Sequence, residues 1–505
     1  MNTNLFFIKT LLLLFILSGC SSDDDATVQE FAVAFENPST SFSTTDEKKD
    51  AKIVFSRNAS EAGNIVVTYT AENATYGAEA DFTTTPSGET GSLTIPFKQG
   101  AKEATFTINK FKNPVEGVTK GLTFSITKVS VPNSTIRGNT NMALSFTESA
   151  ALGGSIAPKV GGVNYPNQVY IDLSAQKTTP VRRDTWEIAF HSGAENTVFL
   201  NSSLRITAAK LSQFTDITSV TSTTAFNPPL EINARNLFTK PISYKKVTVT
   251  TVEDYKKGVK SSYNMYESYA DATDGSTTAI SEISSKEEEN KVYLVYMGSE
   301  IPTEPGAGSI NTTGDDRGWY KIRVLMDGDA YKLQYAALDA TTFTEVMINK
   351  DPNFNTVAFS LTTGKKVNVE PTKGEWDINF SGVFGSEYGT TYSDYVVHNT
   401  LGGTGLYQVT LYKTDKNGVV EKFDVPSYED FGLANVDEKL LDFKKRNAIG
   451  SGWRNAFAKP VAKLKDDRYY IIKDKAGNYY KLRFTAVLNE KNERGNPKFE
   501  YTLLK

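Results

Sequence analysis

The stretch Trp186-Glu187-Ile188-Ala189-Phe190 decides how the chain is interpreted, because it returns almost unchanged as Trp376-Asp377-Ile378-Asn379-Phe380. In both copies, large apolar residues alternate with small or acidic ones, which is the period-two pattern of a strand with one buried face. We therefore expect the tryptophan, isoleucine and phenylalanine of each copy to point inward.

Three more stretches recur in the same order around each pentapeptide. They are a lead-in strand (residues 169–174 and 357–361), a stretch after the pentapeptide (198–204 and 395–401) and a final aromatic hairpin (319–335 and 479–501). Several matches in one order indicate an internal duplication. We place the two units at residues 151–350 and 351–505.

The composition limits the function. The net charge is -4 with 39% apolar residues, and no large Lys/Arg cluster offers the basic face that nucleic-acid binding requires. Threonine, serine, valine, tyrosine and glycine are abundant while long amphipathic runs are few. A mainly β protein with globular cores is therefore expected.

The N-terminus carries a targeting signal. Lys9 precedes a short apolar run, and Leu17-Ser18-Gly19-Cys20 resembles the lipobox of a bacterial lipoprotein. This predicts a signal peptide over residues 1–19 and a lipid on Cys20, the only cysteine, which leaves no intrachain disulfide. The acidic run 21–25, within a tether of residues 20–29, resembles the export signal of Bacteroidota surface lipoproteins. We expect a lipid anchor in the outer membrane that displays the protein on the cell surface.

Residues 30–150 form a threonine- and serine-rich unit with regularly spaced strand signals, which predicts a β-sandwich. The expected strands are residues 31–35, 53–55, 65–70, 92–96, 104–108 and 122–129. Residues 76–82 and 91–96 resemble a Calx-β repeat, an Ig-like sandwich. That family binds calcium through acidic residues after a later strand, where this chain has Asn109-Lys110-Phe111-Lys112 instead, which argues against a calcium site. We expect this domain to be a stalk.

The ordered set of lead-in strand, Trp-acidic strand, glycine-containing loop and aromatic hairpin resembles the HmuY family of haem-binding lipoproteins from Bacteroidota. The second unit is the closer match, through residues 359–380, Gly452-Trp453 and residues 468–501. The resemblance implies two all-β units with few short helices. It also implies haem capture at the cell surface and delivery of haem to a TonB-dependent outer-membrane receptor.

Haem binding needs an apolar slot, groups for the propionates and, usually, axial ligands from His, Met, Tyr or Cys. In the resembled family a pair of His or Met residues lies between the Trp strand and the final hairpin. Here that region offers Met265 and Met297 in the first unit and His398 in the second; His191, the other histidine, directly follows its Trp strand. Each has an ordinary alternative, because methionine commonly fills core gaps and a lone histidine is commonly just hydrogen-bonded.

Catalytic arrangements are scarce. Two histidines and one cysteine supply neither a zinc hydrolase site nor a Cys-His nucleophile, and no phosphate-binding glycine motif occurs. We expect no enzyme. Two other functions stay open: a non-haem accessory or adhesion lipoprotein of an outer-membrane complex, and a glycan-binding module that uses exposed aromatic residues.

Two local expectations complete the interpretation. Apolar residues at near-helical spacing in residues 428–447 predict a helix packed on a sheet. Glycine pairs in residues 150–166 predict a linker and a first turn.

Overall fold

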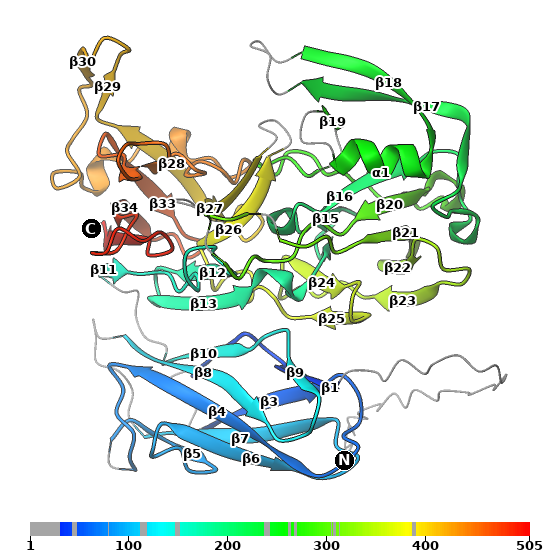
Figure 1. Cartoon of the computed structure of the whole chain (residues 1–505). Helices are drawn as coiled ribbons and strands as arrows, with labels where there is room; N and C mark the ends of the chain where they lie inside the picture. Colours follow the sequence, from blue (N-terminus) through cyan, green and yellow to red (C-terminus); the bar gives the residue numbers. More distant parts are fainter. Residues whose placement is uncertain are drawn as a thin grey trace, which may run out of the picture.

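The structure is a computed structural model that describes residues 31–504 except 43–47, 79, 112–118, 147–151, 237–242, 261–263, 267–269, 305, 307–309, 313 and 386–389. The predicted signal peptide, Cys20 and the acidic tether lie outside the described residues. The expected fold class is confirmed: the described chain is mainly β, with a sandwich below two further β units (Figure 1).

The N-terminal sandwich consists of two five-stranded sheets, ordered β5-β7-β3-β1-β9 and β2-β10-β8-β4-β6. Their strands are β1 (Phe31–Phe35), β2 (Ser39–Phe42), β3 (Lys48–Phe55), β4 (Gly63–Glu72), β5 (Phe82–Thr85), β6 (Ser92–Phe97), β7 (Glu103–Lys110), β8 (Lys120–Val129), β9 (Ser134–Ile136) and β10 (Asn141–Phe146). Alternate residues are buried in β1, β3, β6, β7 and β8, and all members of the resulting core come from this domain. The predicted sandwich is confirmed.

The two later units contain two five-stranded sheets, and the sheet of the second unit takes one edge strand, residues 153–156, from the first unit. The first is ordered β16-β20-β21-β22-β23, and the second β11-β35-β34-β33-β28. Their strands are β16 (Thr207–Leu211), β20 (Val292–Tyr296), β21 (Trp319–Asp327), β22 (Ala330–Ala337) and β23 (Thr344–Ile348), then β11 (Gly153–Ile156), β35 (Lys498–Leu503), β34 (Tyr479–Ala486), β33 (Arg468–Lys473) and β28 (Gly405–Thr410). Because β11 pairs with the last strand of the chain, the linker expected within residues 150–166 is wrong. The turn expected there is present, with Gly161 and Gly162 at positive φ.

The remaining elements are short or peripheral. The helix α1 (Val252–Lys260) lies beside the sheet of β17 (Ala225–Asn236), β18 (Ser243–Thr251) and β19 (Asn264–Tyr266). Two small hairpins are β29 (Tyr412–Thr414) with β30 (Val420–Lys422), and β31 (Arg454–Asn455) with β32 (Lys463–Leu464). The 3-10 turns are η1 (Arg183–Thr185), η2 (Ser202–Leu204), η3 (Ile217–Ser219), η4 (Glu287–Glu289), η5 (Leu433–Asn435) and η6 (Glu438–Leu440).

The two units exchange their lead-in strands. In one shared sheet, β13 (Lys177–Arg182), β12 (Asn167–Asp172), β26 (Ile378–Gly385) and β27 (Thr390–His398) lie in that order. In the other, the order is β15 (Val198–Leu200), β14 (Ile188–His191), β24 (Thr356–Ser360) and β25 (Lys365–Val367). The lead-in strand of each unit therefore pairs with the Trp strand of the other, and the registers correspond, Ile378 opposite Ile171 and Ile188 opposite Phe359.

The exchange mixes the two hydrophobic cores. Ile171 and Leu173 of the first unit are buried in the core of the second, whereas Phe359 and Leu361 of the second unit are buried in the core of the first. Neither core is therefore built from one unit alone.

The helix predicted for residues 428–447 is wrong. The segment forms only η5 and η6, and Asp437 caps η6 by accepting a hydrogen bond from the Lys439 amide. Leu433 and Leu440 are 41% and 56% exposed, so the apolar spacing does not produce a buried helix face.

Candidate functional site

The acidic residue of each repeated pentapeptide fastens the lead-in strand of the other unit. The Asp377 carboxylate accepts a hydrogen bond of 2.8 Å from the Leu173 amide, and the Glu187 carboxylate accepts one of 2.7 Å from the Leu361 amide. Each amide belongs to the residue directly after an exchanged strand, Leu173 after β12 and Leu361 after β24. The repeated acid therefore secures the strand exchange on both sides.

A repeated asparagine fixes each tryptophan. The Asn201 side-chain amide donates to the Trp186 carbonyl (2.7 Å), and the Asn399 amide donates to the Trp376 carbonyl (2.9 Å). The Asn201 and Asn399 backbone amides also donate to the Glu187 and Asp377 carbonyls. The loops that carry Trp186 and Trp376 thus have the same hydrogen bonds, and each places its tryptophan beside the shared sheets.

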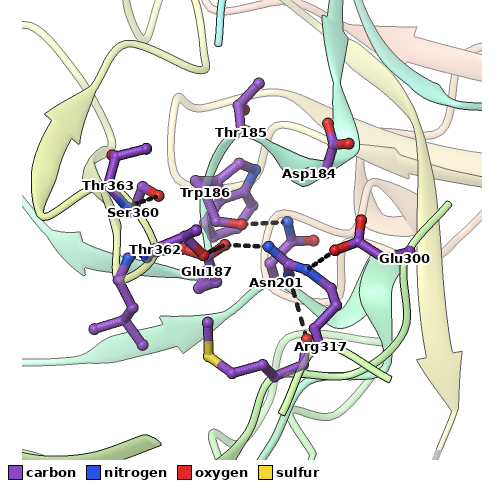
Figure 2. A network of polar contacts seen from close by, with 12 residues as sticks. Asp184, Thr185, Trp186, Glu187, Asn201, Glu300, Arg317, Ser360, Thr362 and Thr363 are labelled. Atoms are coloured by element: carbon purple, nitrogen blue, oxygen red, sulfur yellow. Dashed lines mark hydrogen bonds and ion pairs between the residues drawn. The ribbon is translucent and has the colours of Figure 1, made fainter. Parts of the chain in front are cut away.

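The Glu187 side is held by an ion pair (Figure 2). Arg317 Nη2 donates to Glu187 at 2.5 Å, Thr362 Oγ1 donates at 3.1 Å, and the Glu187 side chain is fully buried. Glu300 meets Arg317 at 3.5 Å but is half exposed. The Glu187 carboxylate therefore links three segments: the loop that carries Trp186, the turn after β24 and the segment before β21.

The Asp377 side carries a second acid in place of an arginine. Burial, followed by the neighbouring Asp172 carboxylate, raises the pKa of Asp377 well above 3.8, and burial also raises the pKa of Asp172. The charged form of this pair is therefore disfavoured in the folded protein.

This difference predicts a pH-dependent effect of Asp377→Asn. Because the folded pKa of Asp377 lies above the unfolded one, its stabilising contribution is complete below the unfolded pKa and is lost as the pH rises through the folded pKa. The amide oxygen of asparagine can still accept from Leu173 but does not ionise. Between pH 4 and pH 8, we expect the free energy of unfolding to fall less in the variant than in the wild type, as measured by urea titrations. Equal pH profiles would contradict the raised pKa of Asp377.

The pentapeptides differ from the expectation in one respect. Ile188, Phe190, Ile378 and Phe380 point into the unit cores, as predicted, but both tryptophans lie in a separate apolar cluster with Tyr170 and Ala358. The tryptophans precede the regular strands, which begin at Ile188 and Ile378. The chain turns between the two positions, so the period-two pattern does not extend to the tryptophan.

A cavity of about 600 Å³ lies at this cluster, between the units. Its size is typical of a small-molecule site. Aromatic side chains border it from both units (Tyr170, Trp186, Phe199, Phe354 and Trp376), as do amides (Gln168, Asn201, Asn349, Asn355, Asn368, Asn379 and Asn399) and charged groups (Lys350, Asp351, Lys366, Glu370 and Arg446). The exchanged strands thus bring residues from distant parts of the chain to one cavity.

Several polar groups at the cavity have no partner. Among the described residues, the side-chain atoms Trp186 Nε1, Trp376 Nε1, Gln168 Nε2, Asn355 Oδ1, Asn379 Oδ1 and His398 Nδ1 are buried without a hydrogen bond. An unpaired buried polar atom is costly, at about 1–3 kcal/mol. Residues with an unpaired buried polar atom are therefore concentrated around this cavity.

Glu370 is the buried ionisable group of the cavity wall. It accepts hydrogen bonds from the Thr356 amide (2.7 Å), the Thr356 hydroxyl (3.0 Å) and the Asn355 side chain (3.3 Å). Burial raises the pKa of Glu370 to about 7, and these hydrogen bonds oppose the rise. The group therefore changes charge close to neutral pH.

The structure brings one of the predicted ligands to the cavity. His398 borders it and is buried, its Nε2 lies 2.8 Å from the Asp442 carbonyl, and burial lowers its pKa. Met297 lies in the core of the first unit, 1% exposed, and does not border the cavity. Met265 belongs to β19, and its side chain lies outside the described residues. His191 is half-buried beside the Glu195 carbonyl.

The sequence did not single out Glu370, Asn355 or Asn379 as site residues. The available signal was the repeat itself, because the matched stretches 198–204 and 395–401 each contain one asparagine, Asn201 and Asn399, and both border the cavity.

The sandwich also reaches this site. Asn368, which borders the cavity, donates to the Glu36 carbonyl (2.6 Å) and Asn37 Oδ1 (2.7 Å), and Lys365 donates to the Ser56 carbonyl. The domain expected to be a stalk therefore supports one cavity wall.

The fold thus places a cavity between two units that exchange strands. The HmuY family model, described as HmuY protein, matches residues 164–339 and 353–501. The chain belongs to the HmuY family. The comparison with curated proteins gave no match.

Some solved structures are similar to parts of the chain. The apo-form Calx CBD1 domain is 14% identical, with 23% of this chain and 96% of that chain covered and a TM-score of 0.20. A two-domain protein with unknown function from Bacteroides fragilis is 12% identical, with 44% and 86% covered and a TM-score of 0.17. At these TM-scores neither likeness carries an argument. Among the described residues, no helix combines the length and apolar character needed to cross a membrane.

Proposed function

We propose that this chain is a cell-surface lipoprotein that captures a small ring-shaped ligand in the cavity between its two units and passes it to an outer-membrane transporter. Haem is the ligand that membership of the HmuY family suggests. The observation that supports capture is the cavity itself, bordered by the tryptophans of both repeated pentapeptides. The proposed role is binding and not catalysis.

Haem fits the cavity only in part. Aromatic walls suit the porphyrin face, and Lys366 and Arg446 suit its propionates. The axial positions are a different matter. Of the residues that border the cavity, His398 and Tyr170 have side chains commonly used as axial ligands. His398 Nε2 already faces the Asp442 carbonyl. Burial raises the pKa of Tyr170 well above 10, which disfavours the phenolate. Among the described residues, no cluster of three His, Cys, Asp or Glu could hold a metal ion. These residues do not provide an axial pair for the haem iron.

Filling the cavity tests the proposal. Ala358 is buried in the cavity wall, so Ala358→Phe should occupy the ligand space and weaken hemin binding by residues 30–505 at least tenfold. Absorbance titration with hemin would measure this change. Ala337→Phe is the matched control, because Ala337 is exposed on β22, outside the cavity. Saturable binding that is equal in both variants would show that the cavity is not the site.

A second candidate is an accessory subunit of an outer-membrane complex. Phe457 is 88% exposed, and Val419, Val420 and Leu440 are all more than half exposed on the second unit. Exposed apolar side chains mark protein contacts where they form one contiguous patch. Absence of saturable small-molecule binding would favour this candidate.

A further inference from the structure

We infer that Arg446 selects the ligand of the cavity. Its guanidinium binds a free carboxylate, so the site takes flat apolar molecules that carry an acidic group and binds their neutral analogues more weakly. The inference rests on the proposed function in that the cavity is the binding site. It names the chemical class of the ligand and the residue that recognises it.

The charged side chains at the cavity leave positive charge uncompensated. Three cations border it, Lys350, Lys366 and Arg446, against two acids, Asp351 and Glu370. Among the described residues, none of the three cations forms an ion pair. The two acids accept hydrogen bonds from amide and hydroxyl groups instead. This balance favours an anionic ligand over a neutral one.

Two of the three cations are poorly suited to hold a ligand. Lys350 Nζ has three N–H groups, and it already meets three acceptors: the Gly193 carbonyl (2.7 Å), Asn196 Oδ1 (3.0 Å) and the Glu195 carbonyl (3.4 Å). Lys366 is exposed on the edge strand β25 and makes no hydrogen bond within the described part of the chain, so nothing fixes its position.

Arg446 is both fixed and free to bind. Its backbone amide donates to the Asp274 carbonyl (3.0 Å), its carbonyl accepts from the His398 amide (2.9 Å), and its Nε donates to the Thr273 carbonyl (3.3 Å). Both units therefore hold it. Its Nη1 and Nη2 make no hydrogen bond to any described residue, and neither is among the fully buried polar atoms. The two terminal nitrogens thus form a positioned fork that a ligand can reach.

One further acid lies near Arg446 and does not occupy its donors. The buried Asp271 carboxylate accepts from the Leu200 amide (2.7 Å) and the Ala279 amide (2.9 Å). Burial raises the pKa of Asp271 to about 6, and these two hydrogen bonds and the Arg446 charge oppose the rise. Because Asp271 takes its hydrogen bonds from the backbone, the guanidinium remains available to a ligand.

The aromatic wall lies close to this guanidinium. Tyr170 and Trp376 pack edge to face with ring centroids 5.0 Å apart. Burial, followed by the Glu370 carboxylate, raises the pKa of Tyr170 well above 10, and the nearby Arg446 charge opposes this rise. A flat apolar ring against these side chains would therefore place an acidic substituent near Arg446.

A carboxylate suits this guanidinium better than other acidic groups do. Its two oxygens accept two parallel N–H groups from the planar fork of an arginine. It also carries a single negative charge, whereas a phosphate dianion would meet the two acids of the cavity with only one free guanidinium to compensate it.

Absorbance titration of residues 30–505 with hemin and with hemin dimethyl ester, in the same detergent buffer, tests the inference. The two probes share the ring and the iron and differ only in their free carboxylates, so any contact to the iron cancels in the comparison. We expect the wild type to bind hemin saturably and the ester more weakly. Arg446→Gln should weaken hemin binding about tenfold, because a charge-assisted contact is lost, and should change ester binding less than about twofold.

Lys445→Gln is the matched control. It removes the same charge one residue away, but Lys445 is 62% exposed, pairs with Asp274 at 3.5 Å and does not border the cavity. Its hemin binding should change less than about twofold. Arg446→Lys keeps the charge and loses the planar fork, so it should bind hemin more weakly than the wild type and more tightly than Arg446→Gln. If Arg446→Gln does not fold, as judged by circular dichroism, the two probes are compared in Arg446→Lys.

The outcomes separate the inference from the proposed function. Equal affinity of the wild type for hemin and its ester overturns the inference, as does an equal loss for both probes in the Arg446 variant, because the carboxylate is then not what Arg446 recognises. Equal losses of hemin binding in Arg446→Gln and Lys445→Gln also overturn it. In these three cases capture of hemin stands. Absence of saturable binding of either probe counts against both the inference and the proposed function.

Discussion

Glu187→Ala is expected to lower the free energy of unfolding by about 3–5 kcal/mol, because it removes the buried partner of the buried Arg317 guanidinium and leaves only the half-exposed Glu300. The substitution also removes the acceptor of the Leu361 amide, so the lead-in strand of the second unit loses its attachment to the first. Urea unfolding followed by circular dichroism would measure the change.

The control for this substitution is Glu300→Ala. Glu300 faces the same arginine at 3.5 Å, but its side chain is 54% exposed. Exposed ion pairs contribute about 0–1 kcal/mol, so this variant should unfold almost like the wild type. Equal losses in both variants would mean that Arg317, and not the strand attachment, governs the response.

The two repeated acids occupy equivalent positions but have diverged. Glu187 is paired with an arginine, whereas Asp377 lies beside the acidic Asp172. The hydrogen bond to the exchanged strand is common to both. We infer that this bond is the shared structural role of the acid and that the neighbouring charge is free to differ between the units.

The sequence allowed the strands to be predicted where one face of a strand is buried and the other is not. Strands β1 and β7 of the sandwich follow this rule, since period-two burial requires period-two sequence. The lead-in and Trp strands do not follow it, because consecutive residues are buried in β12, β14 and β24, within the shared sheets. The segment of residues 428–447 shows the limit. Its apolar spacing is typical of a helix. A local pattern does not show whether another element will pack on the apolar face, and Leu440 remains exposed.

The strand exchange could not have been predicted from the pattern. Both lead-in strands are apolar and of similar length, so each satisfies either Trp strand equally well by pattern alone. The cavity depends on the exchange, because Tyr170 reaches Trp376 only when β12 lies beside β26. His398 could be named in advance because histidine is rare in this chain; Glu370 and Asn355 are common residue types, which sequence alone does not distinguish.

Separating the two units should abolish folding of both. Each isolated half would lack apolar side chains that its core needs: Val169, Ile171 and Leu173 for the second unit, and Phe359 and Leu361 for the first. Burial of these five fully buried side chains contributes on the order of 10 kcal/mol, which is comparable to the whole stability of a typical domain. Residues 151–350 and 351–505, expressed separately, are therefore expected to show no cooperative unfolding transition.

The same halves should recover a folded complex when they are expressed together, because strand exchange needs no covalent link between the units. The sandwich is the internal control: residues 31–146 contain their own complete core and should unfold cooperatively alone. Size-exclusion chromatography and circular dichroism of each species would decide the matter. A single half that folds alone would show that its lead-in strand can return to its own Trp strand, in which case the cavity between the units would depend on the exchange being maintained in the intact chain.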